Sequence, residues 1–93
     1  MDFKKMDKRL KHLLTEALTD FSALYNATGQ GKSQMDLMKK CIQGDKESLQ
    51  NYSNSIAKDF MEEYGAIPKY KVFSMDSEYE TIQNERLQIY NLI

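Results

Sequence analysis

Residues 3–25 read FKKMDKRLKHLLTEALTDFSALY and decide the fold class of this 93-residue chain. Apolar residues recur there at intervals of three and four, the spacing of one helix face, and no glycine or proline interrupts before Gly29. The pattern predicts a helix over residues 2–27, roughly 39 Å long at ~1.5 Å per residue. That length exceeds the span of a compact domain of this size. We therefore expect part of the apolar face to pair with a second copy of the chain, as a homodimer.

Glycines and capping residues divide the remaining chain into further helices. Ser33, followed by Asp36, predicts the start of a second helix, and Asp45 has the side chain to cap a third. Glycine favours helix ends because it adopts the left-handed conformation there at little cost. The predicted helix ends are Gly29, Gly44 and Gly65.

The last third of the chain has a weaker pattern. Pro68 blocks helix continuation, and residues 69–74 favour a short strand or an extended connector. Ser77 and Glu80 predict a last helix over about residues 76–91, although Arg86 interrupts its apolar face and a strand is the alternative. The expected fold is mainly α: one domain spanning residues 1–93, built as a small bundle of three or four helices with a long first helix.

The overall charge conceals an uneven distribution. Lys plus Arg total 13 and Asp plus Glu total 14, for a net charge of −1. Residues 1–12 nevertheless carry five positive and two negative side chains, and residues 45–68 carry two positive and five negative ones. No apolar run is long enough for a signal peptide or a membrane span. The single cysteine, Cys41, fits a reducing cytoplasm, and lysine-rich usage (11 Lys, 2 Arg) suggests a bacterial or phage origin.

Catalytic and cofactor motifs are incomplete. Gly29–Ser33 ends like a phosphate-binding loop, but Asn26 stands where the first glycine is required, so we interpret it as a turn between helices. A weaker anion site near Gly31–Ser33, using Lys32, stays open. His12 precedes Glu16 by four residues and is interpreted as a solvent-exposed pair. We therefore expect no enzyme activity, no metal and no cofactor.

The leading functional hypothesis is an interaction protein: a regulator, adaptor or inhibitor that binds a larger protein through a helical surface. Tyrosine is common in contact surfaces, and the acidic end of the third helix adds charge. The alternative for these aromatic residues is the core of the bundle. The candidate partner-binding residues are Tyr70, Phe73, Tyr79, Tyr90, Glu62 and Glu63.

Nucleic acid supplies two alternative hypotheses. In the first, the basic start of the chain contacts phosphates through Lys4, Lys5, Lys8, Arg9 and Lys11. A helix-turn-helix arrangement of the second and third helices is a weaker form of it. In the second, acidic side chains imitate nucleic-acid phosphates and inhibit a DNA-binding enzyme. The acidic residues concerned are Asp59, Glu62, Glu63, Asp76, Glu78, Glu80 and Glu85.

Overall fold

The computed structural model describes residues 6–65 and 77–93, with the backbone alone for residues 77–79. Within these ranges the chain forms four helices: α1 (Lys8–Thr28), α2 (Lys32–Ile42), α3 (Lys46–Tyr64) and α4 (Ser77–Leu92). This confirms the predicted mainly α bundle, and the last segment is a helix rather than the alternative strand. The strand expected over residues 69–74 lies outside the described residues.

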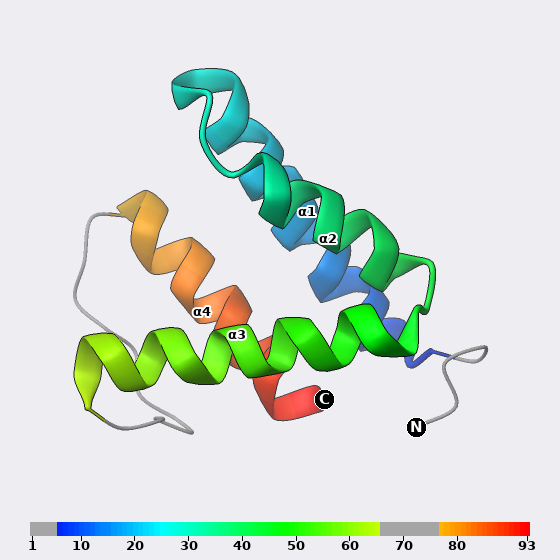
Figure 1. Cartoon of the computed structure of the whole chain (residues 1–93). Helices are drawn as coiled ribbons and strands as arrows, with labels where there is room; N and C mark the ends of the chain where they lie inside the picture. Colours follow the sequence, from blue (N-terminus) through cyan, green and yellow to red (C-terminus); the bar gives the residue numbers. More distant parts are fainter. Residues whose placement is uncertain (1–5, 66–76) are drawn as a thin grey trace.

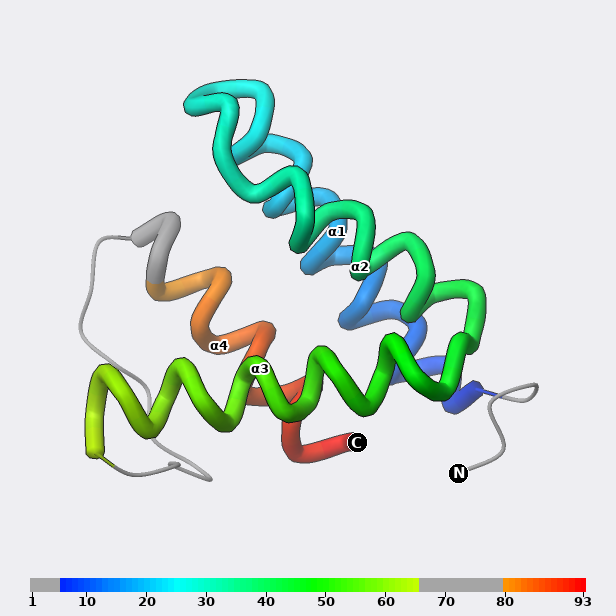
Figure 2. The backbone as a smooth tube through the Cα atoms, in the orientation of Figure 1, coloured from blue at the N-terminus to red at the C-terminus, as the bar shows by residue number. Residues whose placement is uncertain are grey.

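The four helices are arranged as a hairpin with two further helices packed against it. α1 and α2 run antiparallel along each other, and α3 turns away from the end of α2 and crosses the molecule (Figures 1 and 2). α4 packs against both α1 and α3, so the last helix closes the bundle onto the first. In Figure 1 the second half of α1 and the first half of α4 diverge from each other towards the upper left.

The first helix starts later than the sequence pattern predicts. Asp7 is its N-cap, and one carboxylate oxygen accepts hydrogen bonds from the backbone N–H groups of Arg9, at 2.8 Å, and Leu10, at 3.3 Å. The expected start at residue 2 is therefore wrong, because this cap begins the helix at Lys8 although the apolar spacing extends further towards the start of the chain. α1 has 21 residues, or roughly 32 Å, which matches the longest dimension of the molecule, 35 Å. The length of α1 is therefore no reason to expect that it pairs with a second copy of the chain.

The ends of the other helices confirm most, but not all, of the predicted caps. Asp45 caps α3, where its carboxylate accepts from the backbone N–H of Ser48 at 3.1 Å. Gly29 and Gly65 follow α1 and α3 with φ values of +72° and +69°, as expected of glycine C-caps. Ser33 does not cap α2. The cap is Gly31, and the Ser33 hydroxyl donates to the side chain of Gln34 instead.

The core lies where the four helices meet. α1 contributes most of its apolar face, α3 contributes residues at helical spacing, and the two shorter helices complete the cluster. Burying these side chains supplies the main driving force for folding. The buried apolar residues are Leu10, Leu13, Leu14, Ala17, Phe21, Met38, Cys41, Leu49, Tyr52, Ile56, Phe60, Leu87 and Ile89. The chain itself thus covers the apolar stripe of α1 from Leu10 to Phe21.

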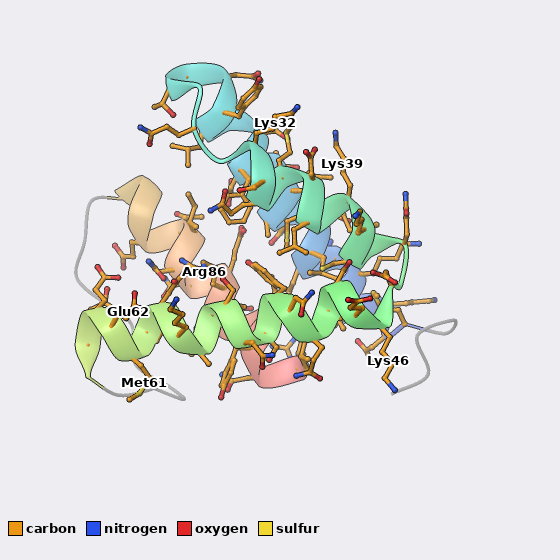
Figure 3. All side chains as sticks on the ribbon, in the orientation of Figure 1. Lys32, Lys39, Lys46, Met61, Glu62 and Arg86 are labelled. Atoms are coloured by element: carbon orange, nitrogen blue, oxygen red, sulfur yellow. The ribbon has the colours of Figure 1, made fainter. Side chains whose placement is uncertain are left out.

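Arg86 has a structural reason for interrupting the apolar face of α4. Its side chain is only 13% exposed and pairs with Asp59 of α3, between the two helices (Figure 3). Gln83, one turn earlier, is also buried. α4 therefore faces the bundle with polar as well as apolar side chains, which explains its weak periodicity. Among the described helices, none is long and apolar enough to cross a membrane.

Candidate functional site

A groove of about 350 Å³ separates the second half of α1 from the first half of α4. On α1 the lining residues recur at intervals of three and four, so they form one face of that helix. The small side chains of Ala23 and Ala27 leave room between the two helices, and both are exposed. The lining residues are Asp20, Ala23, Leu24, Ala27, Thr28, Thr81 and Ile82.

Two carboxyl groups meet beside this groove, and only one of them, Asp20, lines it. Asp20 of α1 lines the groove, and Glu85 of α4 follows Thr81 by one helical turn. Asp20 Oδ2 and Glu85 Oε2 are both buried, and neither has a hydrogen-bond donor among the described residues. Burial, helped by a hydrogen bond to Asp20 and by the charges of Asp20 and Glu16, raises the pKa of Glu85 to about 8. At neutral pH Glu85 therefore holds a proton for most of the time.

A second, smaller cavity of about 70 Å³ is lined in part by Arg86 and Asp59. Tyr52 is 2% exposed, and its hydroxyl has no hydrogen-bond partner among the described residues; the same holds for Arg86 Nε. Burial raises the pKa of Tyr52, while the nearby Arg86 charge acts in the opposite direction. The cavity exceeds the volume that one water molecule needs, and polar groups line it, so ordered water can satisfy both orphan groups. The lining residues are Phe21, Gln34, Leu37, Tyr52, Ser55, Asp59 and Arg86.

The predicted partner-binding residues do not form one described surface. Glu62 and Glu63 are exposed near the end of α3, and Figure 3 shows Glu62 and the exposed Met61 on opposite sides of this helix. Tyr90 is half-buried and packs against the core, so it serves the bundle at least in part. Tyr70, Phe73 and the side chain of Tyr79 lie outside the described residues. The aromatic contact surface stays a prediction.

The basic residues gather more extensively than the sequence shows. Lys8, Arg9 and Lys11 are exposed at the start of α1, while Lys4 and Lys5 lie outside the described residues. Because α1 and α2 are antiparallel, the end of α2 and the start of α3 lie at this same end of the bundle (Figure 1). They add Lys39, Lys40 and Lys46, all exposed.

Nucleic-acid mimicry needs exposed, unpaired carboxylates, and several of the acidic residues do not provide them. Asp59 pairs with Arg86, and Glu85 meets Asp20 inside the bundle, so neither presents a free charge to a partner. Glu62 lies 3.9 Å from Lys58. Asp76 and the side chain of Glu78 lie outside the described residues.

The remaining candidate motifs lie in a turn, on the exposed side of a helix and in the core. Gly29 to Gly31 form the turn between α1 and α2, as predicted, and Lys32 is the first residue of α2. His12 Nε2 lies 2.9 Å from Glu16 Oε1 on the exposed side of α1, as predicted. Cys41 is buried, and burial together with the charge of Asp45 raises its pKa to about 12. The described residues hold no group of three or more His, Cys, Asp or Glu side chains that could bind a metal ion.

Comparison with family models, with curated proteins and with solved structures gave no significant match to this chain. The groove and its carboxyl pair were not predicted from the sequence. The interruption of α4 by Arg86 was the one visible sign that this helix carries polar groups inward.

Proposed function

We propose that this protein is a non-enzymatic interaction protein, a regulator, adaptor or inhibitor that holds a segment of a larger protein in the groove between α1 and α4. The observation that supports it is the apolar lining of this groove, to which Ala23, Leu24, Ala27 and Ile82 contribute. The rest of the apolar face of α1 packs inside the bundle, whereas this part faces a groove. Apolar surface that is grouped in a concavity is typical of sites where another chain binds.

The size of the groove fits this role. A volume of about 350 Å³ accommodates a few side chains of a partner segment. It does not accommodate a folded domain, so the partner has to offer a projecting helix or an extended segment. We also propose a cytoplasmic setting, because the chain contains one buried, unpaired cysteine.

Substitution in the groove tests this proposal. Ala27→Arg places a long charged side chain in the groove, and Asn26→Arg places the same side chain on its exposed neighbour, which does not line the groove. We expect a partner retained from the native host by the unmodified chain and by Asn26→Arg to be lost with Ala27→Arg. A partner retained equally by all three proteins would show that binding uses another surface.

The basic end of the bundle supports a second candidate function, nucleic-acid binding. Among the described residues, six basic side chains (Lys8, Arg9, Lys11, Lys39, Lys40 and Lys46) gather there against four acidic ones, Asp7, Asp36, Asp45 and Glu47. We expect affinity for duplex DNA or RNA to fall steeply with salt and to weaken when Lys39 and Lys40 are replaced by glutamine. A mobility-shift assay that detects no complex at low salt would reject this candidate.

Self-association is a separate proposal. The core residues of α1, such as Leu10 and Leu14, are fully covered by the chain itself, so a homodimer has to use another surface, such as the groove. Light scattering over a wide concentration range tests it. A strict monomer throughout would reject the homodimer.

A further inference from the structure

The carboxyl pair of Asp20, which lines the groove, and Glu85, which lies against Asp20, lacks a positive partner. Asp20 Oδ2 and Glu85 Oε2 are buried acceptors without a donor in the described residues. Leaving a buried acceptor unpaired is costly, and a second carboxylate beside it adds repulsion. A proton held by Glu85 relieves the repulsion but still leaves acceptor positions unfilled.

The charged groups on the surrounding helices do not fill these positions. On α1, Glu16 adds negative charge and already lies against His12. On α4 and α3, the guanidinium of Arg86 is engaged by Asp59. Glu80 lies more than one turn before Glu85 on α4. The charged residues of α2, Lys32, Asp36, Lys39 and Lys40, are exposed.

We propose that the groove binds an apolar segment of a partner protein that carries one lysine or arginine, whose cationic end reaches Asp20 and Glu85. This inference rests on the proposed function and specifies the chemistry of the partner. The apolar part of the segment packs on Leu24 and Ile82, and the cation donates to both carboxylates. An aliphatic stem with a charged tip suits a groove that is lined mainly by apolar side chains and has the carboxyl group of Asp20 among them.

Binding of this kind releases a proton. In the free protein Glu85 holds a proton at neutral pH, and the bound cation replaces it, so the proton passes to the solvent. The proposed complex is therefore favoured by higher pH. With the pKa of Glu85 at about 8 in the free protein, the affinity rises about tenfold from pH 6 to pH 7 and levels off above pH 8.

The first experiment uses n-hexylammonium chloride as a probe, with 1-hexanol as its neutral counterpart, and follows amide resonances of the full chain by NMR. We expect hexylammonium to shift the resonances of Ala23, Ala27 and Ile82 in a saturable manner, more strongly at pH 8 than at pH 6. Hexanol should bind more weakly and without pH dependence. Equal binding of the two probes, or binding of neither, would overturn the proposal.

Variants of the pair provide the second measurement. Asp20→Asn and Glu85→Gln keep the shape of each side chain and remove its charge. We expect each to abolish the preference for the amine, while Glu62→Gln, at an exposed site, preserves it. Thermal melts establish that each variant is folded, and Asp20→Asn substitutes for Glu85→Gln if the latter is not. A preference for the amine that survives in both variants would contradict the role of the pair.

The two proposals fail in different ways. A partner that depends on the groove but binds Asp20→Asn and Glu85→Gln unchanged would remove the requirement for a cation and leave the proposed function intact. A chain that retains no groove-dependent partner would contradict the proposed function itself.

Self-association abolished by Ala27→Arg would identify the occupant of the groove as a second copy of the chain. Stronger amine binding after replacing Lys69 and Lys71 by alanine would identify it as the chain's own residues 66–76. Either result overturns the proposal.

Discussion

Arg86 of α4 pairs with Asp59 of α3, 27 residues earlier in the chain, and the two side chains differ in their access to water. The Arg86 side chain is 13% exposed, whereas that of Asp59 is 45% exposed. Solvent can therefore stabilise a lone Asp59 much better than a lone Arg86. A charge without compensation becomes more costly as its burial increases.

The first prediction follows from this asymmetry. Asp59→Ala leaves the buried guanidinium without its carboxylate and should lower the free energy of unfolding by about 2 kcal/mol. Arg86→Met keeps the aliphatic volume and leaves only a solvated carboxylate, so it should cost less than about 1 kcal/mol. Urea denaturation measures both values. A larger loss for Arg86→Met than for Asp59→Ala would contradict the role assigned to burial here.

The second prediction concerns the pH dependence of stability. The pKa of Glu85 is about 8 in the folded chain, above its ordinary value of 4.5. The folded state therefore binds more protons than the unfolded state between these pH values, so stability should fall as pH rises from about 5 to 8. Because Glu85 retains partial contact with solvent, we expect a loss on the order of 2 kcal/mol at most.

Thermal melts at several pH values test the effect of Glu85. In Glu85→Gln this part of the pH dependence should disappear, because the amide does not titrate. Glu62→Gln, which changes an exposed carboxylate, should keep it. A Glu85→Gln protein with the unchanged pH profile would refute the assignment.

The third prediction concerns the reactivity of Cys41. Its pKa is raised to about 12 by burial and by the charge of Asp45. At pH 8 only about one thiol in ten thousand is then ionised, and the thiolate is the reactive form. A disulfide reagent should modify the native protein very slowly and the urea-unfolded protein rapidly. Fast modification without denaturant would show that the thiol is accessible.

The fourth prediction concerns the start of α1. Asp7→Ala removes the acceptor of two backbone N–H groups and should cost about 1 kcal/mol, whereas Asp7→Ser should retain most of the stability. Ser33→Ala is the matched control, because the Ser33 hydroxyl bonds to Gln34 and not to the backbone. Chemical denaturation distinguishes the two sites. Equal losses in the free energy of unfolding for Asp7→Ala and Ser33→Ala would instead support the prediction that Ser33 caps α2.

The sequence predicts features of this fold that depend on neighbouring residues. Apolar spacing predicts α1, and Asp45 and Gly65 mark the two ends of α3, because periodicity and capping act over a few residues. The predicted start of α1 failed because the apolar spacing continues through Asp7, where the cap intervenes. Gly31 replaced Ser33 as a cap because glycine accommodates the left-handed conformation of this turn, with φ +85°.

The candidate site could not be predicted from sequence patterns. Asp20 and Glu85 are 65 positions apart, and each looks like an ordinary exposed acid on an amphipathic helix. Only the packing of α4 against α1 brings them together. The packing of α4 against α3 likewise explains why Arg86 lies on the apolar face of α4: its guanidinium pairs there with Asp59.

The polar side chains that α4 turns inward also lead to a prediction for the order in which the bundle opens. The inward face of α4 carries Gln83, Glu85 and Arg86, whereas that of α3 carries Leu49, Ile56 and Phe60, so we expect α4 to be held less firmly than α3. Native-state hydrogen exchange should therefore find α4 released in partial openings that leave α1, α2 and α3 protected. Each such release also dismantles one wall of the groove, so a partner that binds there slows amide exchange throughout α4.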